Sequence, residues 1–287
     1  MELIQHDAAI RAGTADSANL LFCINQKVLG LLSTCLRSIL RSGGYGLYHA
    51  YVLHSDLDQS VMRAMERDFR EGVVFHFLQV PEELFADFPE TSRYPKQIYY
   101  RLAAPLLLPR ELDRVLYLDV DIVVINPLKS LYETDFEGNY YVGCTHTRDF
   151  LTKLNQARLK SEKAVAYINT GVLLLNLPLL RENTSMEEIR DYASERRRAL
   201  ILPDQDILTA LYGDKVKLAD TMRYNLSDRI LTLYNAEHTR EKRDVDWVRE
   251  NTVIVHYCGR NKPWLGGYTG MLGVFYQELM EKVSKQA

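Results

Sequence analysis

Cysteine is scarce in this sequence of 287 residues, which contains only four cysteines. Cys23, Cys35, Cys144 and Cys258 lie far apart in apolar surroundings. They show neither the paired spacing of a zinc site nor the density of a secreted disulfide scaffold. We therefore expect free thiols and a cytoplasmic protein.

A long hydrophobic run is also missing. The longest candidate, INTGVLLLNLPLL (residues 168–180), contains two asparagines and a proline and is shorter than the ~20 apolar residues that span a bilayer. The first 25 residues lack the basic region and apolar core of a signal peptide. We expect no transmembrane segment, although peripheral membrane contact stays open, and we expect residues 1–17 to form a flexible tail.

An excess of positive charge is missing as well. The chain has 35 Lys and Arg against 38 Asp and Glu, which gives a formal net charge of −3 and argues against a nucleic-acid partner. One basic run, residues 196–198, is typical of a solvated helix face. Hydrophobic residues at 47% and charged residues at 25% are ordinary for a globular protein.

Strand and helix patterns alternate along the first third of the chain. Residues 18–24, 48–55 and 73–80 read as strands, and residues 28–40 and 58–69 have apolar side chains at helical spacing. This alternation predicts an α/β fold with a mostly parallel central sheet flanked by helices. We expect one domain over residues 18–287. Further helices are expected at 98–108, 203–213 and 273–283, a late strand at 252–259 and an irregular polar insertion at 215–250.

The stretch RVLYLDVDIVVINPL, Arg114 to Leu128, has the apolar residues of a strand that is buried on both faces, yet it contains Asp119 and Asp121. In an extended strand, side chains two residues apart point to the same side. Two unpaired carboxylates in such a place repel each other and are costly to desolvate. A divalent cation held by oxygens would remove this cost. An exposed strand end with one aspartate capping the next turn is the other interpretation.

Polar residues in four other stretches are candidates for the same site. HYCGRNKPW ends a strand with His256 and then places Gly259 and Lys262 in a turn. Histidine can bind a metal, glycine admits a close ligand, and lysine offers a charge to phosphate. The remaining candidates are Asp204 and Gln205 at a helix start, Asn169 before a strand and Arg101 on an apolar helix. Each also has a purely structural interpretation: Asp204 as a helix cap, Asn169 as part of a turn, and Arg101 as a side chain that extends to solvent.

The order of these motifs resembles that in glycosyltransferase family 8. The resemblance rests on YRLAAPLLLP, RVLYLDVDIVVINPLKSLYETDFEGN, YINTGVLLLNL, LPDQDILTALYGDKV and HYCGRNKPW, and it extends from about residue 20 to residue 264. It implies a GT-A fold, which is a Rossmann-like nucleotide-diphospho-sugar transferase fold. It also implies retaining transfer of a sugar from a nucleotide diphosphate donor.

The resemblance also implies roles for individual residues. Asp119, Asp121 and His256 match the metal ligands, for which we expect Mn²⁺ before Mg²⁺. The donor-binding set comprises Asn25, Asp119, Val120, Asp121, Gly259 and Lys262, of which the last two would hold the phosphates. The catalytic set, which contacts the donor sugar, comprises Gln205, Asp204, Asn169 and Arg101. Gln205 is expected nearest the reacting face.

Two positions differ from the pattern of the family. Relatives often have an acidic stretch after the first strand, where this chain has Asn25, Gln26, Lys27 and Val28. Asn25 can both donate to and accept from a uracil edge, so UDP remains the expected nucleotide. His146 stands where relatives often have an acidic residue.

We therefore predict a metal-dependent retaining glycosyltransferase. It would move glucose or galactose from a UDP-sugar to a hydroxyl of a glycan, lipid-linked or polymer acceptor. Because the amide of Gln205 is a poor nucleophile, we favour front-face transfer over a covalent intermediate. The first alternative is a sugar-nucleotide-binding protein with impaired catalysis. The second is a phosphohydrolase of the haloacid dehalogenase type, although Ile122 and Val123 replace its usual Thr or Gly.

Overall fold

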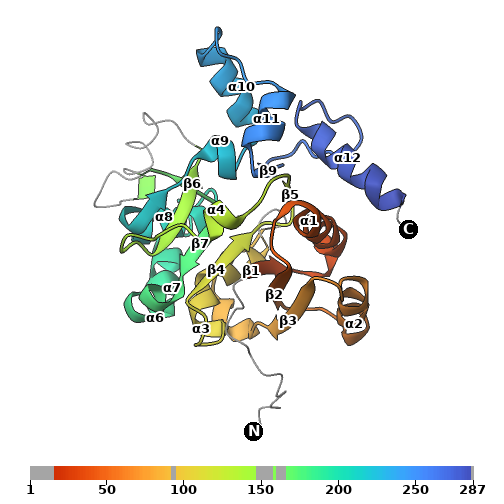
Figure 1. The fold of residues 1–287 in the computed structure, drawn as a ribbon. Helices are drawn as coiled ribbons and strands as arrows, with labels where there is room; N and C mark the ends of the chain where they lie inside the picture. Colours follow the sequence, from red (N-terminus) through yellow and green to blue (C-terminus); the bar gives the residue numbers. More distant parts are fainter. Residues whose placement is uncertain (1–15, 92–94, 147–157, 160–165, 286–287) are drawn as a thin grey trace.

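A seven-stranded sheet forms the centre of the protein, whose computed structural model describes residues 16–91, 95–146, 158–159 and 166–285 (Figure 1). The order of the strands is β3-β2-β1-β4-β7-β6-β8. Their bounds are β1 Ser17–Ile24, β2 Leu47–His54, β3 Val73–Gln79, β4 Arg114–Leu118, β6 Tyr141–Thr145, β7 Ile168–Asn176 and β8 Val216–Leu218. Of the tail expected at residues 1–17, residues 1–15 lie outside the described residues. Ser17 is already the first residue of β1.

Most strand pairs of this sheet are parallel. The pairs β1/β2, β2/β3, β1/β4 and β6/β8 are parallel, whereas β7 is antiparallel to both β4 and β6. The predicted α/β fold with a mostly parallel sheet is confirmed. Because β7 runs in the opposite direction, its first residues lie beside the last residues of β4. This arrangement places the start of one strand and the end of another at one edge of the sheet.

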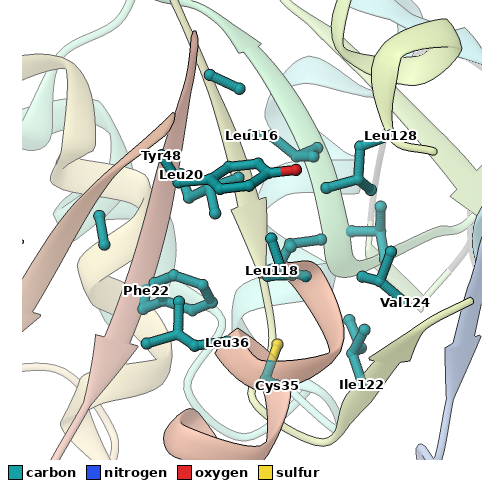
Figure 2. Close-up of a cluster of buried hydrophobic side chains, with 14 of the residues drawn as sticks. Leu20, Phe22, Cys35, Leu36, Tyr48, Leu116, Leu118, Ile122, Val124 and Leu128 are labelled. Carbon is teal, nitrogen blue, oxygen red and sulfur yellow. The ribbon is translucent and has the colours of Figure 1, made fainter. Parts of the chain in front are cut away.

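Apolar side chains cover both faces of the central strands. Leu20 and Phe22 of β1 pack on one face with Leu116 and Leu118 of β4, and α1 (Leu29–Ser42) covers this face (Figure 2). The intervening Leu21 points into a second core on the opposite face. Alternation of this kind is why the strands read as continuous apolar runs in the sequence.

Helices pack on both faces of the sheet (Figure 1). The α-helices other than α1 are α2 Gln59–Asp68, α3 Ala104–Leu107, α4 Lys129–Tyr132, α6 Leu177–Asn183, α7 Met186–Glu195, α8 Pro203–Tyr212, α9 Thr221–Tyr224, α10 Asp228–Glu237, α11 Val245–Asn251 and α12 Gly273–Ser284. Short 3₁₀ helices are η1 Gln26–Val28, η2 Glu82–Phe85, η3 Lys96–Ala103 and η4 Gly213–Lys215. Within the described residues, no helix is long and apolar enough to cross a bilayer.

The helix expected at residues 98–108 is a 3₁₀ helix followed by a single α-helical turn. The change occurs at Pro105, which lies in the first turn of α3. Proline lacks a backbone N–H, so it is accepted at the start of a helix and interrupts one that is already running.

The acidic stretch at residues 114–128 is not one strand, which corrects the sequence interpretation. β4 ends at Leu118, and β5 (Ile122–Val124) belongs to a separate two-stranded sheet with β9 (Ile254–His256). Asp119 and Asp121 therefore lie in the connection between two sheets. Their carboxylates are costly to bury inside a covered sheet, so the chain leaves the sheet where they occur.

The segment at residues 215–250, expected to be irregular, contains β8 and the helices α9, α10 and α11. Three polar residues of this segment are N-caps. The side chains of Asp220, Ser227 and Asp244 accept hydrogen bonds from backbone N–H groups in the first turns of α9, α10 and α11. Leu231 and Val248 are buried in a third apolar core that α12 completes.

Leu116→Ala should destabilise the fold, because Leu116 is 0% exposed at the centre of the sheet. Leu→Ala changes at such sites cost about 2–5 kcal/mol of unfolding free energy. Leu106, which is 61% exposed, provides the control variant Leu106→Ala. Thermal unfolding should show a fall in Tm for the first variant and little change for the second. Equal effects would contradict this assignment of the core.

Candidate active site

A cavity of about 630 Å³ opens at the sheet edge where β4 ends and β7 begins. Its size falls in the range typical of small-molecule sites. The residues that the sequence predicted for the site all line this cavity. They are Asn25, Arg101, Asp119, Val120, Asp121, Asn169, Asp204, Gln205, His256, Gly259 and Lys262.

Asp119, Asp121 and His256 converge on one point. One potential ligand atom from each lies within 4.8 Å of the others. Nε2 of His256 is 3.1 Å from Oδ1 of Asp121 and 3.7 Å from Oδ2 of Asp119. Backbone pairing delivers them: Asp119 N–H donates to the carbonyl of Gly171, and Ile122 in β5 pairs with His256 in β9. Two carboxylates and one imidazole nitrogen form a donor set that fits a divalent cation.

Gly171 allows this convergence because a side chain would not fit there. A Cβ at Gly171 would lie 2.7 Å from Oδ2 of Asp119, and it would meet Cε1 of His256 even more closely. Cβ atoms do not approach other heavy atoms at such distances, so the close approach of these two side chains to β7 requires the glycine. The strand start that carries Asn169 and Thr170 therefore also leaves space for the acidic pair.

Lys262 offsets the negative charge of Asp121. Its Nζ donates to Oδ2 of Asp121 at 2.5 Å and to the carbonyl of Tyr257 at 2.7 Å. Burial alone would raise the pKa of Asp121, but the hydrogen bonds and charges of His256 and Lys262 lower it well below its usual value. Asp121 is therefore ionised at neutral pH and available to a cation. Gly259, at φ 110°, makes the turn between His256 and Lys262 in a conformation that favours glycine.

Arg101 bridges two carboxylates instead of reaching toward solvent. Its guanidinium is 3.2 Å from Oδ1 of Asp119 and 3.3 Å from Oδ2 of Asp204, and it donates to the carbonyl of Thr170 at 2.8 Å. It also lies 4.1 Å over the ring of Tyr117. The charge of Arg101 is therefore held among carboxylates of the protein.

Asp204 is buried at the start of α8. Its Oδ2 accepts a hydrogen bond of 2.6 Å from Oγ1 of Thr170. Burial raises the pKa of Asp204, and the charge of Asp119 adds to that effect, whereas Arg101 and Thr170 oppose it. Asp204 is thus a carboxyl group whose ionised form depends on its neighbours.

Gln205 and Asn169 are joined by their amide groups. Oε1 of Gln205 accepts hydrogen bonds from Nδ2 of Asn169 at 3.1 Å and from the backbone N–H of Thr170 at 3.3 Å. The carbonyl end of Gln205 is therefore engaged, and its Nε2 amide remains for a ligand in the cavity. A carbonyl oxygen held by two donors is a weaker nucleophile than a free one.

The segment after β1 contributes to the lining of the cavity. Asn25, Lys27 and Val28 line it, whereas the backbone N–H of Gln26 donates to Oδ1 of Asp56. Oδ1 of Asn25 accepts from the N–H of Lys27 and caps η1, so its Nδ2 is the group left for a base. Val28 adds an aliphatic side chain to this part of the lining.

His146 lies beside His256 and is not among the residues that line the cavity. Its Nε2 donates to the carbonyl of Asn225 at 2.8 Å, and its ring centroid is 6.3 Å from that of His256. Burial and the neighbouring His256 lower the pKa of His146 to about 4. His146 is therefore neutral at pH 7 and supports the site from outside.

Three further residues were missed by the sequence analysis. Tyr117 donates to Oδ1 of Asp119 at 2.5 Å, and its position two residues earlier in a strand was a usable signal. Gly171 follows Asn169 and Thr170 but had no stated reason to be glycine. Asn225 contacts both His256 and Asn169, and it had no local signal because it lies in the segment that read as an insertion.

Comparison with known proteins agrees with this architecture. The solved structure of galactosyltransferase LgtC in complex with donor and acceptor sugar analogs matches with a TM-score of 0.76 and 24% identity, over 92% of this chain and 95% of that one. The fold is therefore the GT-A fold. Together with the family match below, it defines the class of the protein as a glycosyltransferase.

The model of the family "Glycosyl transferase family 8" matches residues 19–267. The chain belongs to glycosyltransferase family 8, as its motifs suggested, and this excludes the dehalogenase alternative. It is 28% identical to general stress protein A of Bacillus subtilis over 70% of this chain and 71% of that protein. It is 24% identical to a lipopolysaccharide 1,2-glucosyltransferase of Escherichia coli over 80% of this chain and 68% of that protein.

Gly171→Ala should weaken metal binding, because the new methyl group displaces the side chains of Asp119 and His256. We expect the Kd for Mn²⁺, measured by titration calorimetry, to rise roughly tenfold or more, as for other changes that disturb metal ligands. A Cβ added at Gly30 in α1 would have no neighbouring atom within 4 Å, so Gly30→Ala is the matched control. An unchanged Kd for the first variant would contradict the proposed metal site.

Asp204 makes the stability of the fold depend on pH. Because its folded-state pKa is raised, its contribution to stability is fully present below the unfolded pKa and is lost as the pH rises through the folded pKa. Asp204→Asn removes this titration. The Tm of the variant relative to the wild type should therefore be higher at about pH 7 than at about pH 4.5. A difference in Tm that is independent of pH would contradict the raised pKa.

Proposed function

We propose that the protein is a metal-dependent retaining hexosyltransferase that uses a UDP-sugar as donor. The observation that carries this proposal is the convergence of Asp119, Asp121 and His256 beside Lys262 in one cavity of a GT-A fold. A diphosphate needs positive charge on both sides of its bridging oxygens. A cation held by the three ligands and the ammonium group of Lys262 together supply that charge.

Mn²⁺ suits the donor set better than Mg²⁺, because Mg²⁺ prefers oxygen ligands and water. When bound, the metal would neutralise the negative charge that develops on the leaving diphosphate. In the structure, the ammonium group of Lys262 donates a hydrogen bond to Asp121. A bound diphosphate would give the same ammonium group a second negatively charged partner. Lys262 would then contact the phosphates at the turn made by Gly259, which lines the cavity together with Val120.

The sugar end of the donor would lie against Arg101, Asn169, Asp204 and Gln205. Gln205 presents an amide and not a carboxylate, and its carbonyl oxygen is held by two donors. A covalent glycosyl-enzyme intermediate needs a free nucleophile at this place. We therefore favour front-face transfer. In that step the bond from the acceptor oxygen to the anomeric carbon forms as the bond to the diphosphate oxygen breaks, and the acceptor proton moves to that diphosphate oxygen.

UDP is the expected nucleotide because Nδ2 of Asn25 remains for the base. Glucose and galactose are the candidate sugars, since the similar proteins named above include a glucosyltransferase and a galactosyltransferase. The acceptor would be a hydroxyl of a glycan, lipid-linked or polymer chain. We place the acceptor side at the segment 215–250, whose residue Leu226 pairs with β9 next to the cavity.

A thermal-shift panel with UDP-glucose, UDP-galactose and UDP tests this function in the presence and absence of Mn²⁺. A ligand at about a hundredfold its Kd adds roughly 2.7 kcal/mol of stability, so we expect Tm to rise when both Mn²⁺ and the correct UDP-sugar are present. Slow release of UDP from the same sugar then distinguishes an enzyme from an impaired sugar-nucleotide-binding protein. No stabilisation by any of the three ligands would contradict the proposal.

Asp121→Asn should keep the fold and lose the Mn²⁺-dependent part of both the Tm shift and UDP release, because it removes the charge of one ligand. Asp87 is exposed and lies outside the motifs of the site, so Asp87→Asn is the control variant and should behave like the wild type. Unchanged UDP release by Asp121→Asn would remove Asp121 from the metal site.

A further inference from the structure

Asn225 is fully buried, with 0% of its surface exposed, between the candidate metal ligand His256 and the amide pair of Asn169 and Gln205. Backbone pairing places it there. The N–H of Leu226 donates to the carbonyl of Ile254, and the N–H of His256 donates to the carbonyl of Leu226. The segment before α10 is thus held against β9, and the side chain of Asn225 meets the imidazole edge that points away from the acidic pair.

The donor and the acceptor of each hydrogen bond among these side chains can be assigned. Backbone N–H groups can only donate, and those of Gly171 and Thr170 donate to Oδ1 of Asn169 at 3.2 Å and to Oε1 of Gln205 at 3.3 Å. These two contacts decide which end of each amide is the oxygen. Nδ2 of Asn169 then donates to Oε1 of Gln205, as its distance of 3.1 Å indicates.

The donors and acceptors of the two hydrogen bonds of Asn225 follow from this assignment. Because Oδ1 of Asn169 is an acceptor, Asn225 must donate to it through Nδ2, at 2.9 Å. Oδ1 of Asn225 therefore faces Nδ1 of His256 at 2.8 Å and accepts its proton. Because Nδ1 keeps its proton for Asn225, Nε2 is the nitrogen that can offer a lone pair to a cation, in place of its contact with Asp121, and it faces both Asp119 and Asp121.

We propose that Asn225 is a positioning residue that fixes two groups at once, the metal-binding tautomer of His256 and the amide orientation of Asn169 and Gln205. Two backbone N–H groups of β7 decide which end of each amide donates, and Asn225 extends this order of donors and acceptors to His256. Metal-ligating histidines generally rely on such a partner at the second nitrogen. The inference rests on the proposed function, because it takes His256 as a metal ligand and Gln205 as the residue that faces the sugar.

Asn225→Asp separates the two effects, because aspartate keeps the acceptor for His256 and loses the donor for Asn169. We expect a Kd for Mn²⁺ within about threefold of the wild-type value. The rate of UDP release from a saturating UDP-sugar with Mn²⁺ should fall about 10- to 100-fold, because Asn169 must turn its amide and displace that of Gln205. Metal affinity and turnover would thus respond differently to the same substitution.

Asn225→Ala is the comparison variant, because it removes both contacts. Its Kd for Mn²⁺, measured by calorimetry without donor, should rise about 10- to 100-fold. The proposal is overturned if Asn225→Asp loses as much Mn²⁺ affinity as Asn225→Ala, which a general packing role predicts. It is also overturned if Asn225→Asp releases UDP at the wild-type rate, because Asn225 would then have no effect on the orientation of the Gln205 amide.

Asn169→Asp makes the same comparison if Asn225→Asp does not fold. The carboxylate introduced at position 169 would still accept from Asn225 but would no longer donate to Gln205, so Mn²⁺ affinity should stay and UDP release should fall. Loss of Mn²⁺ affinity equal to that of Asn225→Ala would overturn the proposal. A wild-type protein that binds no Mn²⁺ would instead refute the proposed function at the metal, and the inference about His256 with it.

Discussion

Electrostatic repulsion among three carboxylates at the end of a buried sheet is the constraint on which the rest of the site depends. Asp119, Asp121 and Asp204 lie around one cavity, and ionised carboxylates in such surroundings are costly without counter-charges. Arg101 bridges two of them, and Lys262 bonds the third. Removing either cation would leave a partly buried negative charge, so these side chains serve the fold as well as the site.

The antiparallel strand β7 gives the cavity its second wall. In a wholly parallel sheet, the start of this strand would lie at the opposite edge from the end of β4. Its reversed direction brings Asn169, Thr170 and Gly171 to the carboxylates of Asp119 and Asp121, and it supplies the backbone N–H groups that orient the neighbouring amides. A single change of strand direction thus joins the charged half of the cavity to its amide half.

Much of the fold and most of the site could be predicted from local pattern. The alternation of apolar runs indicated the strands and α1, and five motifs indicated residues that the structure brings to one cavity. The errors arose where one residue type serves two purposes. Asp119 and Asp121 read as part of a strand although they lie between β4 and β5. The segment 215–250 read as an irregular polar insertion although its polar residues Asp220, Ser227 and Asp244 cap helices.

The sequence by itself determined the chemistry of the site: three carboxylates, an imidazole, an ammonium group, a guanidinium group and two amides, each within a recognisable motif. Only the tertiary structure decided how these groups are oriented. Asn225 meets His256 across 31 residues and Asn169 across 56, and contacts over such separations leave no periodic signal in the chain. The direction of a hydrogen-bond chain depends on which backbone N–H groups end up beside it, and that is settled by strand pairing.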